Sequence, residues 1–104
     1  MSFPFAGIVT ERPYPPTGLT SARWLNEVRI EPVEFAELYL TQNGVRISPL
    51  FGVEPHESSD LFPHVVQWNG KRYLENGHHR VTRAALVYNF VAMLMRVFPI
   101  GETP

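Results

Sequence analysis

The chain has 104 residues, which is enough for one domain with a single modest core. Hydrophobic residues make up 44% of it and aromatic residues 12%, which excludes the composition of a disordered chain. The chain has no cysteine. This excludes disulfides, thiolate metal sites and thiol nucleophiles, and it is typical of a reducing environment.

Charge is distributed unevenly, although the formal net charge is only −1. Residues 1–63 carry four Arg and eight Asp or Glu (4 − 8 = −4), whereas residues 64–96 carry five Lys or Arg and one Glu (5 − 1 = +4). The second segment also holds three of the four histidines. This polarity indicates either a binding face for an anion or ordinary scatter.

The first part of the chain is rich in proline. We expect residues 1–21 to form an extended arm that wraps the domain or a second subunit. The predicted organisation is a proline-rich arm at 1–23 and a domain at 24–104. The start lacks the basic segment of a signal peptide, and the apolar stretch 90–100 is far shorter than the ~20 residues of a membrane span. We therefore expect a cytoplasmic protein.

Two elements are predicted between the arm and residue 43. Trp24–Val33 alternates apolar and polar positions, which favours a strand that ends near its proline. Val33–Gln42 has apolar residues at helical spacing and predicts a helix, with Asn43-Gly44 as its C-cap. Prolines and glycines in Gly44–Phe62 exclude a long helix and predict a loop.

A β-hairpin is predicted after Pro63. His64–Trp68 and Lys71–Glu75 flank Asn69-Gly70, the dipeptide that favours a two-residue type I′ turn. Asn76-Gly77 then predicts a turn out of the second strand.

A helix and a last strand complete the expected fold. An apolar stripe at helical spacing predicts about three turns of helix; it consists of Val81, Ala84, Ala85 and Tyr88. Val91–Phe98 is mostly apolar and predicts a strand closed by Pro99. The order strand, helix, loop, hairpin, helix, strand indicates a small α+β domain with a mixed sheet.

The strand, turn and helix start within Tyr73–Ala85 predict a phosphate-binding corner. A helix that starts at His78 or His79 presents unpaired N–H groups and the positive end of its dipole. Gly77 has no Cβ to obstruct a ligand, and Arg80 adds a donor fork for the same anion. Cations in a first helical turn oppose the dipole unless an anion is bound there.

Structural roles compete with binding at this corner. Asn76 is able to cap the helix, and Arg80 is able to pair with a carboxylate such as Glu75. Glu75 is able either to activate a water molecule or to pair with Arg80 or Arg72. Arg83, one turn further on, either extends the anion site or is solvated.

The run from Glu75 to Arg80, E-N-G-H-H-R, followed by Ala84-Ala85, resembles the glycine–x–x–arginine box of the ParB/sulfiredoxin superfamily, whose commonest form is D-G-H-H-R. Pro63-His64-Val65-Val66 looks like the proline-started strand of that family, and Thr41-Gln42 looks like its T-Q. The resemblance covers roughly residues 28–98. It implies a ParB/sulfiredoxin-like domain.

In this superfamily the turn and helix start hold nucleotide phosphates, which maps to Gly77, His78, His79 and Arg80, with Arg83 as an extension. The resemblance therefore implies binding of a nucleotide triphosphate with Mg²⁺, or of the phosphates of nucleic acid. It also implies nucleotide hydrolysis or phosphoryl transfer, for which the candidate catalytic residues are Glu75 and His79.

The chain departs from these relatives in ways that weaken the catalytic interpretation. His78 stands where sulfiredoxin chemistry needs a cysteine, which excludes that chemistry. Asn76 stands where kinase-like and nuclease-like members have aspartate, and an amide is no general base. Partition proteins add a helix-turn-helix DNA-binding domain, which is not expected in the few residues after Phe98.

A metal–histidine site is not expected, because adjacent histidines on a helix diverge by ~100° and no H-x-x-x-H spacing occurs. Four aromatic residues offer a stacking surface for a base or fill the core, and we expect at least two in the core: Trp24, Trp68, Tyr73 and Tyr88.

Two further functions are compatible with the sequence. One is a non-catalytic protein-interaction scaffold, encoded by a phage or plasmid, that retains the fold and binds a host or partner protein. The other is a DNA-binding or nicking accessory that uses the basic half of the chain.

Overall fold

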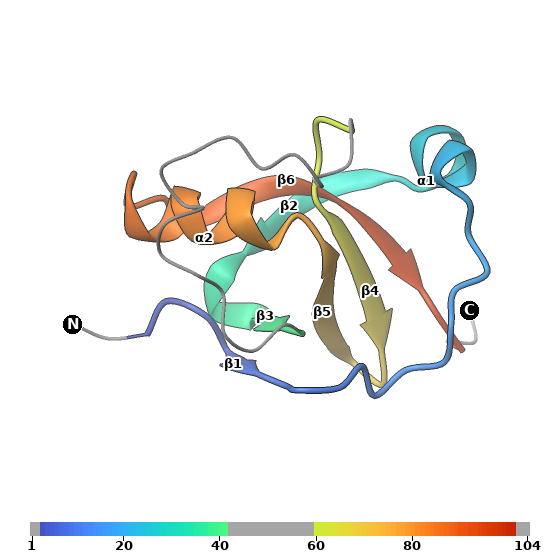
Figure 1. Ribbon diagram of the computed structural model, residues 1–104, viewed down its shortest axis with the longest axis horizontal. Coiled ribbons are helices and arrows are strands. Elements are labelled where there is room, and N and C mark those ends of the chain that lie inside the picture. Colours follow the sequence, from blue (N-terminus) through green and yellow to red (C-terminus); the bar gives the residue numbers. More distant parts are fainter. Residues whose placement is uncertain (1–2, 42–59, 102–104) are drawn as a thin grey trace.

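One mixed sheet of six strands organises the computed structural model, which describes residues 3–41 and 60–101 (Figure 1). The strands are β1 (Gly7–Ile8), β2 (Ile30–Glu34), β3 (Leu38–Leu40), β4 (His64–Trp68), β5 (Lys71–Asn76) and β6 (Ala92–Pro99). Two α-helices, α1 (Ser21–Glu27) and α2 (His78–Leu86), and a short 3₁₀ turn, η1 (Phe35–Glu37), join them. The expected small α+β domain with a mixed sheet is confirmed.

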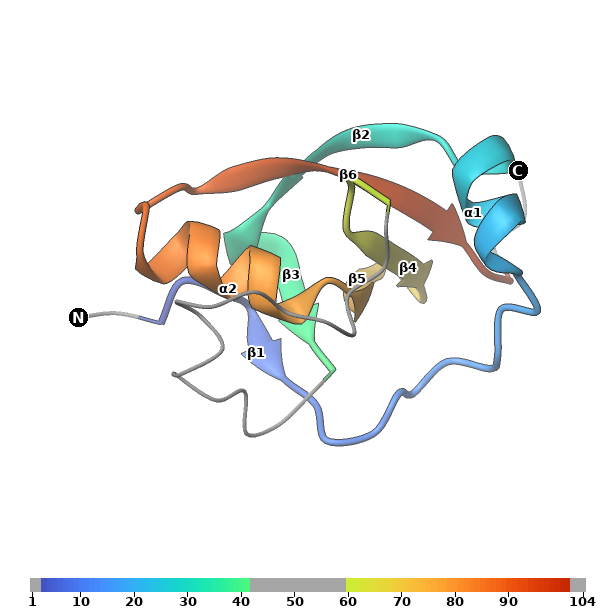
Figure 2. The ribbon, with the colours of Figure 1, turned by 45° about the horizontal axis from the view of Figure 1, so that its top comes forward.

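The strand order across the sheet is β1-β3-β5-β4-β6-β2. The pairs β1–β3, β3–β5 and β4–β6 are parallel, and β4–β5 and β2–β6 are antiparallel. Figures 1 and 2 show α1 and α2 at opposite ends of the sheet. The described helices include none that is long and apolar enough to cross a membrane.

The β4–β5 hairpin forms where the sequence predicts it. Its turn residues Asn69 and Gly70 have φ angles of 51° and 75°, and the flanking pair is Trp68 with Lys71. Two successive positive φ angles are the requirement of a type I′ turn, which an Asn-Gly pair meets with little strain. The hairpin prediction is confirmed.

The turn into α2 also forms as predicted, and Gly77 is its pivot. Gly77 has a φ of 97°, and a Cβ built there would lie 3.0 Å from Pro63 Cβ. The left-handed angle and the close approach both require glycine. Helix α2 starts directly after it, at His78.

The predicted apolar stripe of α2 holds for three of its four members. Val81, Ala84 and Ala85 are buried, whereas Tyr88 lies beyond the helix and is 55% exposed. The helix ends at Leu86 because Asn89, with a φ of 58°, turns the chain away toward β6. The inclusion of Tyr88 in the stripe was wrong.

The predicted strand Trp24–Val33 is wrong in its first half. The chain is helical over Ser21–Glu27, and the strand begins at Ile30. The Thr20 hydroxyl accepts a hydrogen bond of 3.2 Å from the Arg23 N–H, and this cap starts the helix. Val28 and Ile30 gave the alternating pattern; Val28 directly follows α1, and Ile30 is the first residue of β2.

The predicted helix Val33–Gln42 is also wrong. Residues 33–34 end β2, and Leu38–Leu40 form β3, a parallel strand between β1 and β5. The apolar spacing is that of a strand, since Leu38 and Leu40 are buried on one face while Tyr39 stacks on Tyr73 on the other. The expected Asn43-Gly44 cap and all but the end of Gly44–Phe62 lie outside the described residues.

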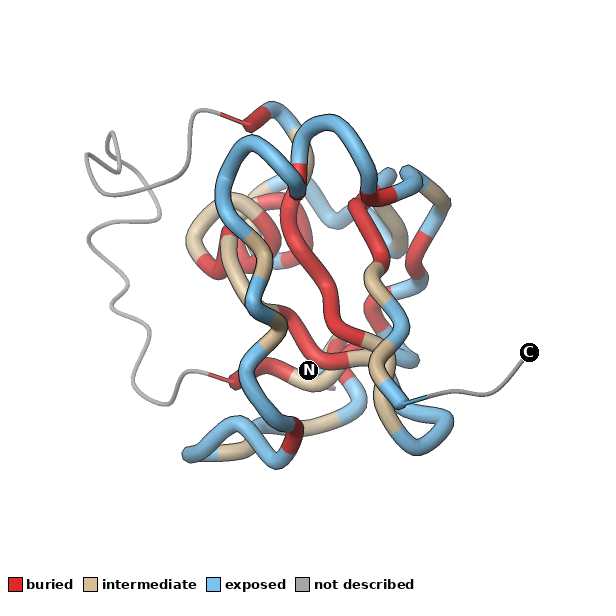
Figure 3. Tube along the Cα trace, turned by 90° about the vertical axis from the view of Figure 1, so that its right-hand side faces the viewer, coloured by how far each residue is buried: buried red, intermediate tan, exposed pale blue. Residues whose placement is uncertain are grey.

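Both faces of the sheet are covered. One face packs against α2 and buries Val65, Leu74 and Met95. On the other face, the N-terminal segment packs Tyr14, Trp24 and Val28 over Val66 and Tyr73. Figure 3 shows the buried residues concentrated along the central strands, with the connections exposed. Of the four predicted aromatic residues, Trp24 and Tyr73 are in the core, as expected.

The last predicted strand, Val91–Phe98, is confirmed as β6 with a shift of one residue at each end. The N-terminal segment runs from β1 along one side of the molecule to α1 (Figure 1). It contributes β1 to the sheet edge and Tyr14 to the core. The division into an arm at 1–23 and a domain at 24–104 stays a prediction.

Candidate functional site

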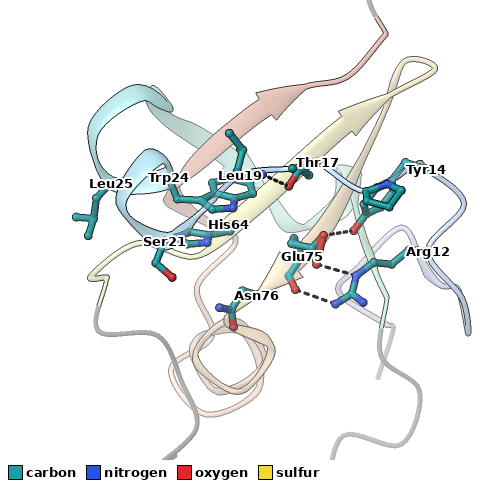
Figure 4. Close-up of a pocket in the computed structure, with 12 residues that line it drawn as sticks. Arg12, Tyr14, Thr17, Leu19, Ser21, Trp24, Leu25, His64, Glu75 and Asn76 are labelled. Atoms are coloured by element: carbon teal, nitrogen blue, oxygen red, sulfur yellow. Dashed lines mark hydrogen bonds and ion pairs between the residues drawn. The ribbon is translucent and has the colours of Figure 1, made fainter.

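An open groove of about 890 Å³ lies beside the predicted phosphate corner (Figure 4). The N-terminal segment forms one wall, from Arg12 to Leu25. The opposite wall comes from the ends of the hairpin strands, with His64 on β4 and Glu75 and Asn76 on β5. The groove is therefore built by two segments that are far apart in the sequence.

Glu75, the predicted catalytic carboxylate, is held by the N-terminal segment (Figure 4). Arg12 Nε lies 2.7 Å from Glu75 Oε2, and the Tyr14 hydroxyl donates to Glu75 Oε1 at 3.1 Å. Burial, with the nearby Glu75 carboxylate, raises the pKa of Tyr14. The carboxylate therefore fastens residues 12–14 to β5, with Arg12 as a partner that the sequence spacing did not suggest.

The residues of the predicted phosphate turn fall into two groups: those at the start of α2, and His79 and Arg83 on the partly exposed side of the helix. Gly77, His78 and Arg80 lie together at the start of α2, as predicted. Arg80 Nη1 donates to the Asp60 carbonyl oxygen at 2.6 Å, and Asn76 Oδ1 accepts from the Gly77 N–H at 2.8 Å. The N-cap of α2 is Gly77, without a side-chain cap, so the alternative of an Asn76 cap is wrong.

His78 points into the protein, where it is 7% exposed. Its Nε2 accepts a hydrogen bond of 3.2 Å from the backbone N–H of Thr41. Burial lowers the pKa of His78 to about 4, with smaller contributions from the nearby positive charges of Arg12 and His79. His78 is therefore a neutral structural link between α2 and the end of β3.

His79 and Arg83 lie on the partly exposed side of α2, one helical turn apart. The Arg83 guanidinium lies over the Tyr88 ring, 5.9 Å from its centroid. Arg83 therefore contacts a residue beyond the end of the helix. The catalytic role of Glu75 and His79 and the phosphate-binding role of these turn residues stay predictions.

A buried polar cluster, which the sequence did not reveal, lies behind the groove. Asp60 Oδ2 is 2.8 Å from His64 Nε2 and 2.6 Å from Arg96 Nε. The side chains of all three are at least nine-tenths buried. Arg96 Nη1 also donates to the Val28 carbonyl at 3.2 Å. Asp60 and His64 are four residues apart, but Arg96 is 36 residues from Asp60, so no local spacing signals the cluster.

The cluster fixes the charge state of its members. Burial alone would raise the pKa of Asp60, but hydrogen bonds from Arg96 and His64 outweigh it and lower that pKa to about 2. Burial lowers the pKa of His64, although Asp60 opposes this shift. The cluster is therefore an Arg96–Asp60 ion pair to which a neutral His64 donates a hydrogen bond.

An exposed apolar surface lies at the far end of α2. Leu86 is 49% exposed, Tyr88 and Phe90 are each 55% exposed, and Val91 is 78% exposed. We call these four residues the apolar corner. Large apolar side chains gathered on a surface are typical of a contact with another macromolecule.

Among residues 3–41 and 60–101, no group of three or more His, Asp or Glu side chains is arranged to hold a metal ion. The Mg²⁺-bound nucleotide that the resemblance implied would need ligands from its own phosphates. It stays a prediction.

A family model described as Antitoxin VapB-like matches residues 3–101. No curated protein and no solved structure matches the chain.

This match overturns the resemblance to the ParB/sulfiredoxin superfamily, and it gives no support to the nucleotide binding that the resemblance implied. The box at Glu75–Arg80 is short. Here β5 turns sharply into α2 through Gly77, which has a left-handed backbone angle. Unrelated proteins use the same local geometry where a strand turns into a helix, so it does not identify a family. Because the family model spans nearly the whole sequence, the chain belongs to the Antitoxin VapB-like family.

Proposed function

We propose that the chain is an antitoxin that binds a partner toxin protein and blocks it by contact, without a chemical step of its own. The match of the Antitoxin VapB-like family to residues 3–101 is the observation that carries this proposal. It corresponds to the protein-interaction scaffold among the functions that the sequence allows.

The contacts of Glu75, a candidate catalytic residue, and of His78 in the predicted phosphate turn support a non-catalytic role. The Glu75 carboxylate is held by Arg12 at Oε2 and by Tyr14 at Oε1, so both of its oxygen atoms already have partners in the fold. His78 is buried and accepts from Thr41, so it cannot exchange protons with a substrate in the groove. These side chains stabilise the fold.

The proposal is tested by neutralisation in bacteria. The protein encoded by the gene next to that of this chain is expressed from an inducible promoter, alone and together with the chain. We expect the neighbouring protein to arrest growth, co-expression to restore growth, and the two proteins to co-purify as a complex of fixed stoichiometry. Growth arrest that persists in the presence of the soluble, folded chain, with no complex formed, would contradict the proposal.

Two variants separate neutralisation by contact from an enzymatic effect. Glu75→Gln and His79→Gln remove the candidate base and proton shuttle while conserving side-chain size. We expect both variants to restore growth as well as the wild-type chain does. Loss of rescue in both variants, with unchanged circular dichroism, would favour a catalytic mechanism.

A further inference from the structure

Strand β2 forms one edge of the sheet, and a proline lies in the middle of this strand. Because β2 is the last strand in the order β1-β3-β5-β4-β6-β2, only β6 pairs with it among the described residues (Figure 2). Pro32 is the third of the five residues of β2. The sequence predicted that the strand would end near this proline, but the strand continues through it to Glu34.

The hydrogen bonds at the two ends of the β2–β6 pair show which way each backbone group points. The Val97 N–H donates to the Arg29 carbonyl at 3.0 Å, and the Phe35 N–H donates to the Val91 carbonyl at 2.9 Å. Between these two pairs the register continues without a shift. Backbone groups alternate in direction along an antiparallel strand. The odd-numbered residues of β2 therefore bond to β6, and the even-numbered residues point to the free edge.

Pro32 belongs to the even-numbered residues, together with Ile30 and Glu34. We call these three residues the outward row. Proline has no N–H, but the pairing with β6 does not use one at this position. The missing donor instead lies at the free edge, where a second strand would meet the proline ring in the middle of the outward row. All three residues of the row are exposed to solvent.

Apart from its proline, this edge has the properties of one that pairs with another chain. Leu94 lies opposite Pro32 on β6 and is 52% exposed, and Ile30 is 41% exposed. Exposed apolar side chains beside an unpaired strand edge favour the addition of a further strand. The nearest opposite charges are paired within the chain, since Arg29 Nε lies 2.9 Å from Glu31 Oε2. Like-charge repulsion alone therefore does not account for a closed edge.

We propose that Pro32 closes the β2 edge, so that a second copy of the chain cannot extend the sheet through it. In a symmetric antiparallel pair of two β2 strands, Pro32 would lie opposite its own counterpart, and Ile30 opposite Glu34. Such a pair lacks both hydrogen bonds at its centre, where two proline rings replace the N–H groups. The proposal concerns the chain alone and does not depend on the antitoxin function.

Pro32→Val restores the missing N–H and tests the proposal directly. Valine is well suited to a strand, and the restored N–H points outward, so the pairing with β6 is unchanged. Sedimentation velocity at pH 7 compares the variant with the wild-type chain over a concentration series. We expect the wild-type chain to remain a monomer. The variant is expected to dimerise, with a dissociation constant at least about tenfold lower than that of any self-association of the wild type.

A proline moved along the outward row provides a matched rescue. Glu34 has a φ of −79°, which proline tolerates, and its N–H also points to the free edge. The double variant Pro32→Val/Glu34→Pro is therefore expected to be a monomer again. It also removes a negative charge, which by itself favours association, so the return to monomer is due to the proline. Pro16→Val, which replaces an exposed proline outside the sheet, is the control and is expected to stay monomeric.

Amide hydrogen exchange identifies the surface that associates. In a Pro32→Val dimer we expect the N–H groups of Ile30 and Glu34 to exchange at least tenfold more slowly than in the wild-type monomer, because the second copy covers them. Circular dichroism and urea unfolding confirm that each variant is folded.

Three results would overturn the proposal. The first is a folded Pro32→Val variant that remains as monomeric as the wild type. The second is a Pro32→Val dimer that persists in the double variant, which would place the association on another surface. The third needs no variant: protection of the Ile30 and Glu34 N–H groups that rises with the concentration of the wild-type chain would show that the edge pairs in spite of its proline.

Discussion

The indole ring of Trp24 stacks on the imidazole ring of His64, with centroids 4.2 Å apart and planes 7° apart. This contact joins α1 to the first residue of β4. His64 bonds to Asp60, and Asp60 pairs with Arg96 on β6, so the stack is the outer end of a connected series of side chains. The N-terminal segment is thereby fixed to the middle of the sheet.

Replacing Trp24 is expected to loosen this attachment. Trp24 is 5% exposed and also meets Phe98 edge-on. Trp24→Ala leaves a cavity and exposes the polar cluster behind it, which we expect to lower the free energy of unfolding by about 3–5 kcal/mol. Urea denaturation at pH 7 measures the change. Trp24→Phe keeps an aromatic ring against His64 and is expected to cost less than half as much; equal losses would show that the stack is unimportant.

Two glycines with left-handed backbone angles provide a matched comparison. Gly77 and Gly18 have φ angles of 97° and 71°, but only at Gly77 would a Cβ meet other atoms, at 3.0 Å from Pro63 Cβ. We expect Gly77→Ala to destabilise the fold by about 2 kcal/mol more than Gly18→Ala, because the second substitution carries only the strain of the angle. Thermal and urea unfolding of the two variants measure the difference. Equal losses would show that the contact with Pro63 imposes no constraint.

The second half of the fold follows from short-range signals in the sequence. Asn69-Gly70 specifies its turn because both φ angles must be positive, and Gly77 specifies the entry into α2 for a similar reason. These signals need no knowledge of distant residues. The hairpin and α2 could therefore be predicted with nearly correct boundaries.

The first half depends on partners that are distant in the sequence. Leu38–Leu40 becomes a strand because it lies between β1 and β5, and this placement overrides an apolar spacing that also fits a helix. In the same way, Arg12 pairs with Glu75, 63 residues away, and Asp60 pairs with Arg96. Pairings of this kind leave no periodic pattern, so the polar cluster and the groove wall could not be predicted from spacing.

The Asp60 carboxylate is expected to contribute stability that depends on pH. Its pKa in the folded protein is lowered from an ordinary value of 3.8 to about 2. The folded state therefore favours the ionised carboxylate, which contributes roughly 2 kcal/mol above pH 4 and loses that contribution as the pH falls toward 2. Carboxyl resonances followed by NMR between pH 1.5 and 6 give the midpoint directly. A midpoint near or above 3.8 would contradict the buried ion pair.

Removing the carboxylate tests the same pair at neutral pH. Asp60→Asn keeps the shape of the side chain but leaves the Arg96 guanidinium buried without its counter-charge. We expect a loss of about 3–5 kcal/mol in the free energy of unfolding at pH 7. The difference between the variant and the wild type should shrink below pH 3, where the wild-type carboxylate also begins to lose its charge. A difference that is constant with pH would indicate that Asp60 contributes through shape alone.

His78 gives a second pH dependence, in a higher window. Its pKa in the folded protein is lowered from 6.5 to about 4, mainly because it is buried and to a smaller extent because Arg12 and His79 lie nearby. The unfolded chain binds a proton below pH 6.5 and the folded chain does not, so stability falls as the pH drops from about 6.5 to about 4, by roughly 3 kcal/mol in total. Urea denaturation at half-unit steps of pH measures this slope.

His78→Gln is the variant that isolates the proton. The glutamine side-chain oxygen is able to accept from the Thr41 N–H, as Nε2 does, but the amide does not titrate. We expect the variant to be less stable than the wild type at pH 7, because the ring packing is lost, and to lose less stability on going to pH 4. Since His64 also has a lowered pKa, part of the slope should remain in the variant. An unchanged slope in His78→Gln, or an imidazole resonance of His78 that titrates near 6.5, would mean that the ring faces solvent and does not link α2 to the end of β3.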